Sequence, residues 1–125
     1  MLLRPTMHRV CARWGVATVL AVAAFLAQAH AIIVSSQPAA GAVVQQKDTA
    51  IELRFNSRID HHRSRLFLIR PDGTRSDLII LDETRPDIVA ARASGLAPGS
   101  YRVRWQVLSI DGHITRGDIP FSVAQ

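Results

Sequence analysis

Sulfur is almost absent from this chain of 125 residues. Its one cysteine, Cys11, and its two methionines, Met1 and Met7, all lie near the start. From residue 30 onward there is neither residue type, so that part cannot be held by disulfides and offers no thiolate or thioether ligand to a metal. Its stability must therefore come from an apolar core.

Blocks of basic residues are also missing. The chain has a formal net charge of +5, from 15 Lys/Arg against 10 Asp/Glu, but three of the arginines precede residue 30. The remainder carries 12 basic and 10 acidic side chains, a net charge of +2, and the two signs are mixed along the sequence. A surface that binds nucleic acid needs clustered positive charge, so nucleic acid is not an expected partner.

Residues 1–29 have the pattern of a secretory signal peptide. Three arginines lie in residues 1–13, and an apolar run follows at residues 15–27. That run is shorter than the roughly 20 residues of a membrane-spanning helix, and Ala27-Gln28-Ala29 fits a signal-peptidase site. We expect cleavage after Ala29 and export of one domain, residues 30–125, with no membrane insertion afterwards. An uncleaved N-terminal anchor is the alternative.

After residue 30 the sequence consists of short β-type segments separated by turn residues. No long segment has helical periodicity, and residues 56–63 are polar enough to predict a connection. About seven short strands in one small domain predict an antiparallel β-sandwich or a Greek-key barrel. We expect these strands at residues 31–35, 50–55, 66–69, 78–81, 88–91, 101–107 and 119–123.

Two segments alternate clearly enough to predict which side chains face the core. Ile51, Leu53 and Phe55 alternate with charged residues, and residues 101–107 are apolar at every odd position. Because successive side chains of a strand point to opposite faces, the apolar set should be buried. Trp105 belongs to that set.

Cleavage after Ala29 would make His30 the first residue. Its free α-amine and ring Nδ1 can then close a chelate on one metal ion. The triplet Asp111-Gly112-His113 places a carboxylate and an imidazole two residues apart, on one side of an extended segment. If this segment lies beside the first strand, His30, Asp111 and His113 form a metal site rich in nitrogen and oxygen.

Such a donor set suits Zn²⁺, Cu²⁺ or Ni²⁺, and Cu²⁺ forms the tightest complexes of this series. Copper(I) prefers sulfur, which is missing after residue 30, so copper(II) is favoured. Two simpler interpretations stay open. Asp111-Gly112 is also a common hairpin turn pair, with His113 merely exposed, and a histidine at position 30 can be a coincidence.

The remaining histidine pair, His61-His62, is a weaker candidate. Neighbouring side chains diverge in an extended segment, and Arg58, Arg63 and Arg65 would repel a cation. A solvated loop is the favoured interpretation. No hydrolase or phosphate-loop motif is present, so we expect no catalytic residues, no enzymatic activity and no organic cofactor.

The sequence from residue 30 onward resembles the CopC family of periplasmic copper-resistance proteins. The resemblance covers essentially the whole predicted domain, and the N-terminal histidine with a late Asp-Gly-His is its specific part. The matching segments are His30-Ala31, VSSQPAAG (34–41), IELRF (51–55), LAPGSYRVRW (96–105), VLSIDGH (107–113), Gly117 and FSV (121–123).

The resemblance implies a seven-stranded Greek-key β-barrel similar to cupredoxin or immunoglobulin domains. It implies a periplasmic protein that binds copper(II) through the amine and ring of His30, Asp111 and His113. We expect this protein to be a monomer. Such a protein would sequester copper or pass it to a CopD-like inner-membrane importer. Some family members also carry a methionine-rich copper(I) site, which this chain cannot form.

Two other functions remain as alternatives. One is a copper-dependent oxidative enzyme with an N-terminal histidine brace. The other is a β-sandwich interaction module without a metal.

Overall fold

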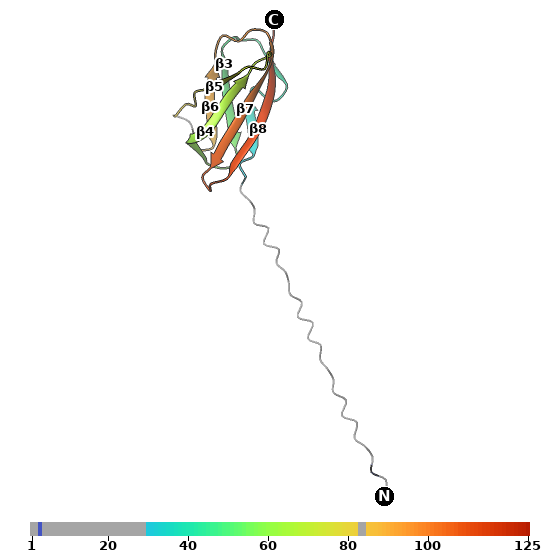
Figure 1. Ribbon diagram of the computed structural model, residues 1–125, viewed down its shortest axis with the longest axis vertical. Coiled ribbons are helices and arrows are strands. Elements are labelled where there is room, and N and C mark those ends of the chain that lie inside the picture. Colours follow the sequence, from blue (N-terminus) through green and yellow to red (C-terminus); the bar gives the residue numbers. More distant parts are fainter. Residues whose placement is uncertain (1–2, 4–29, 83–84) are drawn as a thin grey trace.

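Two β-sheets packed face to face make up the folded part of the chain (Figure 1). The computed structural model describes residue 3, residues 30–82 and residues 85–125, so the predicted signal peptide and its cleavage site lie almost wholly outside the described residues. The described residues form eight strands and contain no helix that could cross a membrane. The strands are β1 (Ile33–Gln37), β2 (Ala42–Val44), β3 (Thr49–Phe55), β4 (Ile59–Ile69), β5 (Arg75–Leu78), β6 (Ile88–Ala93), β7 (Gly99–Ser109) and β8 (Ile114–Val123).

The chain crosses repeatedly between the sheets, as in Greek-key sandwiches. One sheet has the order β1-β3-β6 and the other β2-β8-β7-β4-β5. All pairs are antiparallel except β2 with β8. The prediction of an all-β sandwich is confirmed. The structure has one strand more than the seven predicted segments, and this additional strand is β2, a three-residue edge strand.

The core lies between the sheets and is built from alternating strand residues. Ile51, Leu53 and Phe55 are each about 1% exposed, as predicted for β3. The odd positions of β7 from Tyr101 to Ser109 are buried as well, and the ring of Trp105 meets that of Phe55 edge-on at 5.4 Å between centroids. This aromatic contact joins β7 of the larger sheet to β3 of the smaller one.

The predicted connection at residues 56–63 is wrong, because β4 already begins at Ile59. Asp60 is opposite Leu108 and Arg65 is opposite Gln106, so an advance of five residues along β4 corresponds to only two residues along β7. The extra residues form a bulge, which explains their polar sequence. Side chains close it: Asp60 Oδ1 accepts the His62 N–H at 3.1 Å, and the Ser64 hydroxyl accepts the Leu108 N–H at 3.0 Å.

Two other strands are displaced from their predicted positions. The first strand is β1, two residues later than expected, and the predicted strand at residues 78–81 is replaced by β5. The tight turn at residues 70–74 brings Arg75 directly opposite Ile69, so pairing resumes at once. Leu81 then donates its N–H to the Ala90 carbonyl at 2.9 Å, which turns the chain toward the other sheet.

Gly117 makes room for the indole of Trp105. The two residues pair across β7 and β8, so their side-chain positions lie on the same face. A Cβ added at Gly117 would lie 2.5 Å from Cζ2 of Trp105 and 2.9 Å from its Nε1. Any side chain at position 117 must therefore displace the tryptophan.

We expect Gly117→Ala to lower the free energy of unfolding by about 1–3 kcal/mol, the usual cost of overpacking a core. In a Trp105→Phe background the same substitution should cost much less, because the atoms it would contact have been removed. Urea denaturation of the four proteins of this cycle measures the difference. An equal cost in both backgrounds would contradict the contact.

Candidate metal centre

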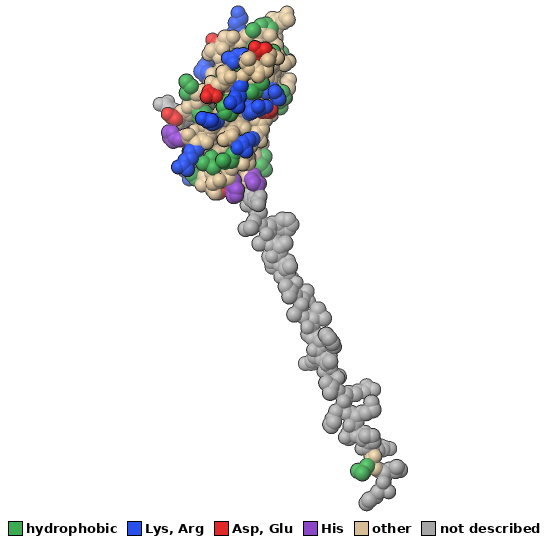
Figure 2. All heavy atoms as spheres, in the orientation of Figure 1, with side chains coloured by type: hydrophobic (Ala, Val, Ile, Leu, Met, Phe, Trp, Pro, Cys, Tyr) green, Lys and Arg blue, Asp and Glu red, His purple; other side chains and the backbone are tan. Residues whose placement is uncertain are grey.

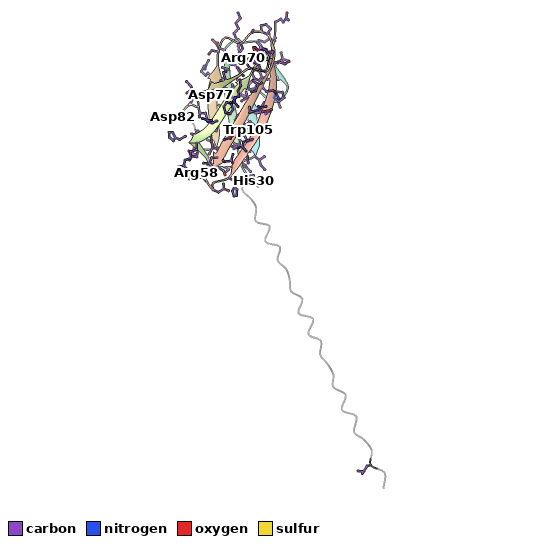
Figure 3. All side chains as sticks on the ribbon, in the orientation of Figure 1. His30, Arg58, Arg70, Asp77, Asp82 and Trp105 are labelled. Carbon is purple, nitrogen blue, oxygen red and sulfur yellow. The ribbon has the colours of Figure 1, made fainter. Side chains whose placement is uncertain are left out.

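His30 is placed by hydrogen bonds to the two residues that follow it. The Thr115 hydroxyl, on β8, donates to the Ala31 carbonyl at 3.1 Å, and Ala31 is 3% exposed. The Ile32 N–H donates to Asn56 Oδ1 at 2.8 Å, and the Asn56 N–H donates to the Ile32 carbonyl at 3.0 Å. These bonds hold the start of the domain against β8 and the end of β3, and His30 lies at the end of the folded domain opposite the C-terminus (Figures 1 and 3).

Asp111-Gly112-His113 forms the turn between β7 and β8. Ser109 donates its N–H to the His113 carbonyl, and Gly112 donates its N–H to the Ser109 carbonyl, both at 2.9 Å. Gly112 has a φ of 92°, a conformation that favours glycine. The expectation of an extended segment is therefore wrong here, because residues 111–113 form a hairpin turn.

The turn nevertheless brings the carboxylate and the imidazole together. Asp111 Oδ1 accepts hydrogen bonds from the Ser109 hydroxyl and, at 3.2 Å, from the His113 N–H. Oδ2 lies 3.1 Å from Nδ1 of His113. Because the carboxylate can only accept, Nδ1 carries the proton of this contact, and Nε2 is the ring nitrogen of His113 that keeps a lone pair.

These hydrogen bonds stabilise the charged form of Asp111. The hydroxyl of Ser109 contributes most, followed by the ring and the backbone N–H of His113, and together they lower the pKa of Asp111 from 3.8 to about 2. The group therefore stays anionic under any condition in which an imidazole is neutral and able to bind a metal.

His30 and His113 lie side by side, although 83 positions separate them in the sequence. Their ring centroids are 5.4 Å apart and the ring planes meet at 68°. Figure 2 shows histidine side chains gathered at this end of the domain. Among the described residues, however, no group of three His, Cys, Asp or Glu side chains is already arranged to hold a metal ion.

The structure thus brings His113 together with each of the other two predicted ligands. The fourth predicted donor, the His30 α-amine, does not exist in the uncleaved chain, where this nitrogen is bonded to Ala29. Sequence reasoning missed the residues that position the ligands, namely Ser109, Thr115 and Asn56. Only Ser109 could have been found from the sequence. It is a polar residue that continues the alternating pattern of buried odd positions in β7, so a buried hydrogen-bonding role could have been inferred.

His61 and His62 are in the bulge of β4 and not in a loop. His61 is half-buried, and its Nε2 lies 2.5 Å from the carbonyl oxygen of Ile88 on β6. Since a carbonyl only accepts, this ring nitrogen donates and links the two sheets. The His61 ring thus ties β4 to β6. His62 is exposed.

The depressed pKa of Asp111 gives a testable pH dependence. Because the folded-state pKa lies below 3.8, the carboxylate stabilises the hairpin fully above pH 3.8, and this contribution is lost as the pH falls toward 2. Carboxyl ¹³C NMR of the metal-free protein should show Asp111 titrating near pH 2.

In Ser109→Ala the Asp111 pKa should move up toward 3.8, because the largest stabilising hydrogen bond is gone. Thr115→Ala removes a hydroxyl that does not contact Asp111 and should leave the pKa near 2. A value that Ser109→Ala leaves unmoved would contradict the assignment of Ser109 as the main cause.

Comparison with known proteins relates this arrangement to copper proteins. The CopC domain family model matches residues 33–124. Protein YobA of Escherichia coli K12 is 33% identical over 98 residues, which cover 76% of this chain and 79% of YobA.

Two solved structures are similar in fold and sequence. The crystal structure of CopC from Methylosinus trichosporium OB3b has a TM-score of 0.71 and 29% identity, over 76% of this chain and 94% of that one. PcoC of E. coli, described as a methionine-rich copper resistance protein, has a TM-score of 0.60 and 25% identity, over 76% and 99%. Residues 30–125 of the present chain contain no methionine.

The family model covers most of the chain, and the fold agrees with that of the CopC and PcoC structures. The predicted resemblance and the expectation of a non-enzymatic protein are therefore confirmed. The chain belongs to the CopC family, which consists of copper-resistance proteins and not of enzymes.

Proposed function

We propose that this is an exported protein that binds one copper(II) ion at its N-terminus in the periplasm. The observation that carries the proposal is the contact of His30 with His113, whose rings lie 5.4 Å apart at one end of the sandwich. Two imidazoles and one carboxylate at this end are donors that copper(II) prefers, and sulfur, which copper(I) prefers, is absent after residue 30.

Each ligand has a distinct role in the proposed site. His30 supplies its α-amine and Nδ1 as a chelate, and His113 supplies Nε2. Asp111 has two oxygens, each with two lone pairs, and Oδ2 makes one described contact, with Nδ1 of His113. It can therefore orient His113 and also offer a lone pair to the ion.

Cleavage after Ala29 is a necessary part of this proposal. The amine that completes the chelate is released only when the bond between Ala29 and His30 is cut. The precursor would therefore lack the full site, and copper would be loaded after export. Storage, or transfer to a CopD-like importer in the inner membrane by a monomeric carrier, fits a ligand set near the surface, where the His113 side chain is 51% exposed.

We expect protein that begins at His30 to bind one equivalent of copper(II) tightly, in competition with a chelator, and to give a tetragonal, nitrogen-rich EPR spectrum. His30→Ala and His113→Ala should weaken binding by orders of magnitude. His62→Ala is the matched control, because it removes an exposed imidazole from β4 and should leave affinity unchanged.

One added glycine before His30 distinguishes the amine chelate from a site made of side chains alone. This extension keeps every side chain but moves the amine away, so affinity should again fall by orders of magnitude. If the extended protein binds as tightly as the natural one, the proposed chelate is wrong.

Copper should also stabilise the fold, because a ligand that binds only the native state shifts unfolding by mass action. Free copper(II) at a hundred times its Kd would add about 2.7 kcal/mol to the free energy of unfolding. Thermal unfolding with and without one equivalent of copper(II) measures the rise in Tm. An unchanged Tm would favour a metal-free interaction module.

A further inference from the structure

A second candidate site lies on the outer face of the larger sheet. There a hollow of about 550 Å³ is lined by four arginines, Arg65, Arg75, Arg104 and Arg116. Figure 2 shows Lys and Arg side chains gathered over the middle of the visible face, where Figure 1 places β4, β7 and β8. The copper proposal uses none of these residues.

The register of β4, β7 and β8 brings Arg65, Arg104 and Arg116 close together on the outer face of the sheet. Arg65, Gln106 and Arg116 lie in line across β4, β7 and β8. The next row facing the same way contains Asp77, Phe67, Arg104 and Asp118. Neighbouring strands are about 4.8 Å apart, so side chains as long as arginine reach a common volume above Gln106 and Phe67.

The hollow carries a net positive charge. Its lining has a formal charge of +3, from four arginines against the carboxylate of Asp118. Asp77, which lies opposite Phe67 on β5 at the edge of the hollow, reduces this to +2. Asp118 already accepts from Arg104 Nε at 2.9 Å and from Arg102 at 3.3 Å. Among residues 30–82 and 85–125, no carboxylate forms an ion pair with Arg65, Arg75 or Arg116.

Three of the four guanidinium groups are held in place before any ligand binds. The Arg75 guanidinium lies over the ring of Phe67, 4.5 Å from its centroid. Arg116 donates from Nε to Gln106 Oε1 at 2.9 Å, and Arg104 is held by Asp118. Such preorganisation reduces the entropy lost on binding, and the terminal N–H groups of Arg116 remain for a ligand.

We propose that this hollow binds a phosphate group. A guanidinium recognises phosphate through a planar fork of donors, and one phosphate offers three oxygens to several guanidinium groups at once. A concave site with converging arginines fits a compact oxyanion better than an extended acidic protein surface. Inorganic phosphate or pyrophosphate, and the headgroup of an anionic phospholipid, share this chemistry.

Calorimetric titration of the copper-free protein with inorganic phosphate and with pyrophosphate, at low ionic strength, tests the free-anion source. Copper is left out because pyrophosphate binds it directly. Co-sedimentation with phosphatidylcholine vesicles, with and without phosphatidylglycerol, tests the lipid source. Neither measurement depends on cleavage after Ala29 or on a copper site, so the two proposals succeed or fail separately.

Arg65→Gln and Arg116→Gln should each weaken binding about tenfold or more, the effect of losing one charge-assisted contact. Arg92→Gln is the matched control: it removes the same charge from an exposed position of β6, in the other sheet, and should have little effect. Circular dichroism of the variants verifies the fold.

Binding of either soluble anion with this pattern of variants supports the site with a free anion as ligand. Binding confined to phosphatidylglycerol vesicles, with the same pattern, supports the site with a lipid headgroup. If neither probe binds, or if Arg92→Gln weakens binding as much as Arg65→Gln does, the proposal is overturned.

Discussion

The hairpin of β7 and β8 is the element on which the rest of this structure depends. Its ladder runs from Gly99 opposite Val123 to Leu108 opposite Ile114. The inner face places Trp105 over Gly117 and against Phe55, which joins the two sheets. The turn carries two of the proposed copper ligands, and the outer face carries arginines of the proposed phosphate site. Because backbone pairing fixes all three at once, a slip in register would disturb core, turn and surface together.

The candidate metal centre is formed by the start of the domain and its last hairpin. The bond from Thr115 to Ala31 spans 84 residues, so His30 and His113 meet only in the folded protein. Asp111 is held by the turn itself, through Ser109 and His113. The predicted ligands are thus positioned by Thr115, Asn56 and Ser109, and Asp111 itself holds Nδ1 of His113, which leaves Nε2 as the other ring nitrogen.

The alternation of apolar and polar residues predicted the strands that bury only one of their two faces. β3 and β7 alternate strictly because one face packs on the core, and their buried residues followed directly from the pattern. Prediction failed at the edges and at the bulge. β2 is an edge strand of only three residues, and the edge strand β5 has a single apolar residue, Leu78. The polar bulge of β4 resembles a loop because side chains of Asp60 and Ser64 replace part of the ladder.

The sequence by itself determined the β class, the absence of sulfur ligands and the candidate ligands His30, Asp111 and His113. These follow from composition and local pattern, which do not depend on long-range pairing. Only the tertiary structure decided that His30 lies beside His113, that Asp111 contacts the His113 ring within a turn, and that four arginines from four strands share one hollow. Such contacts depend on sheet order and register, and residues far apart in the chain establish these only when they fold together.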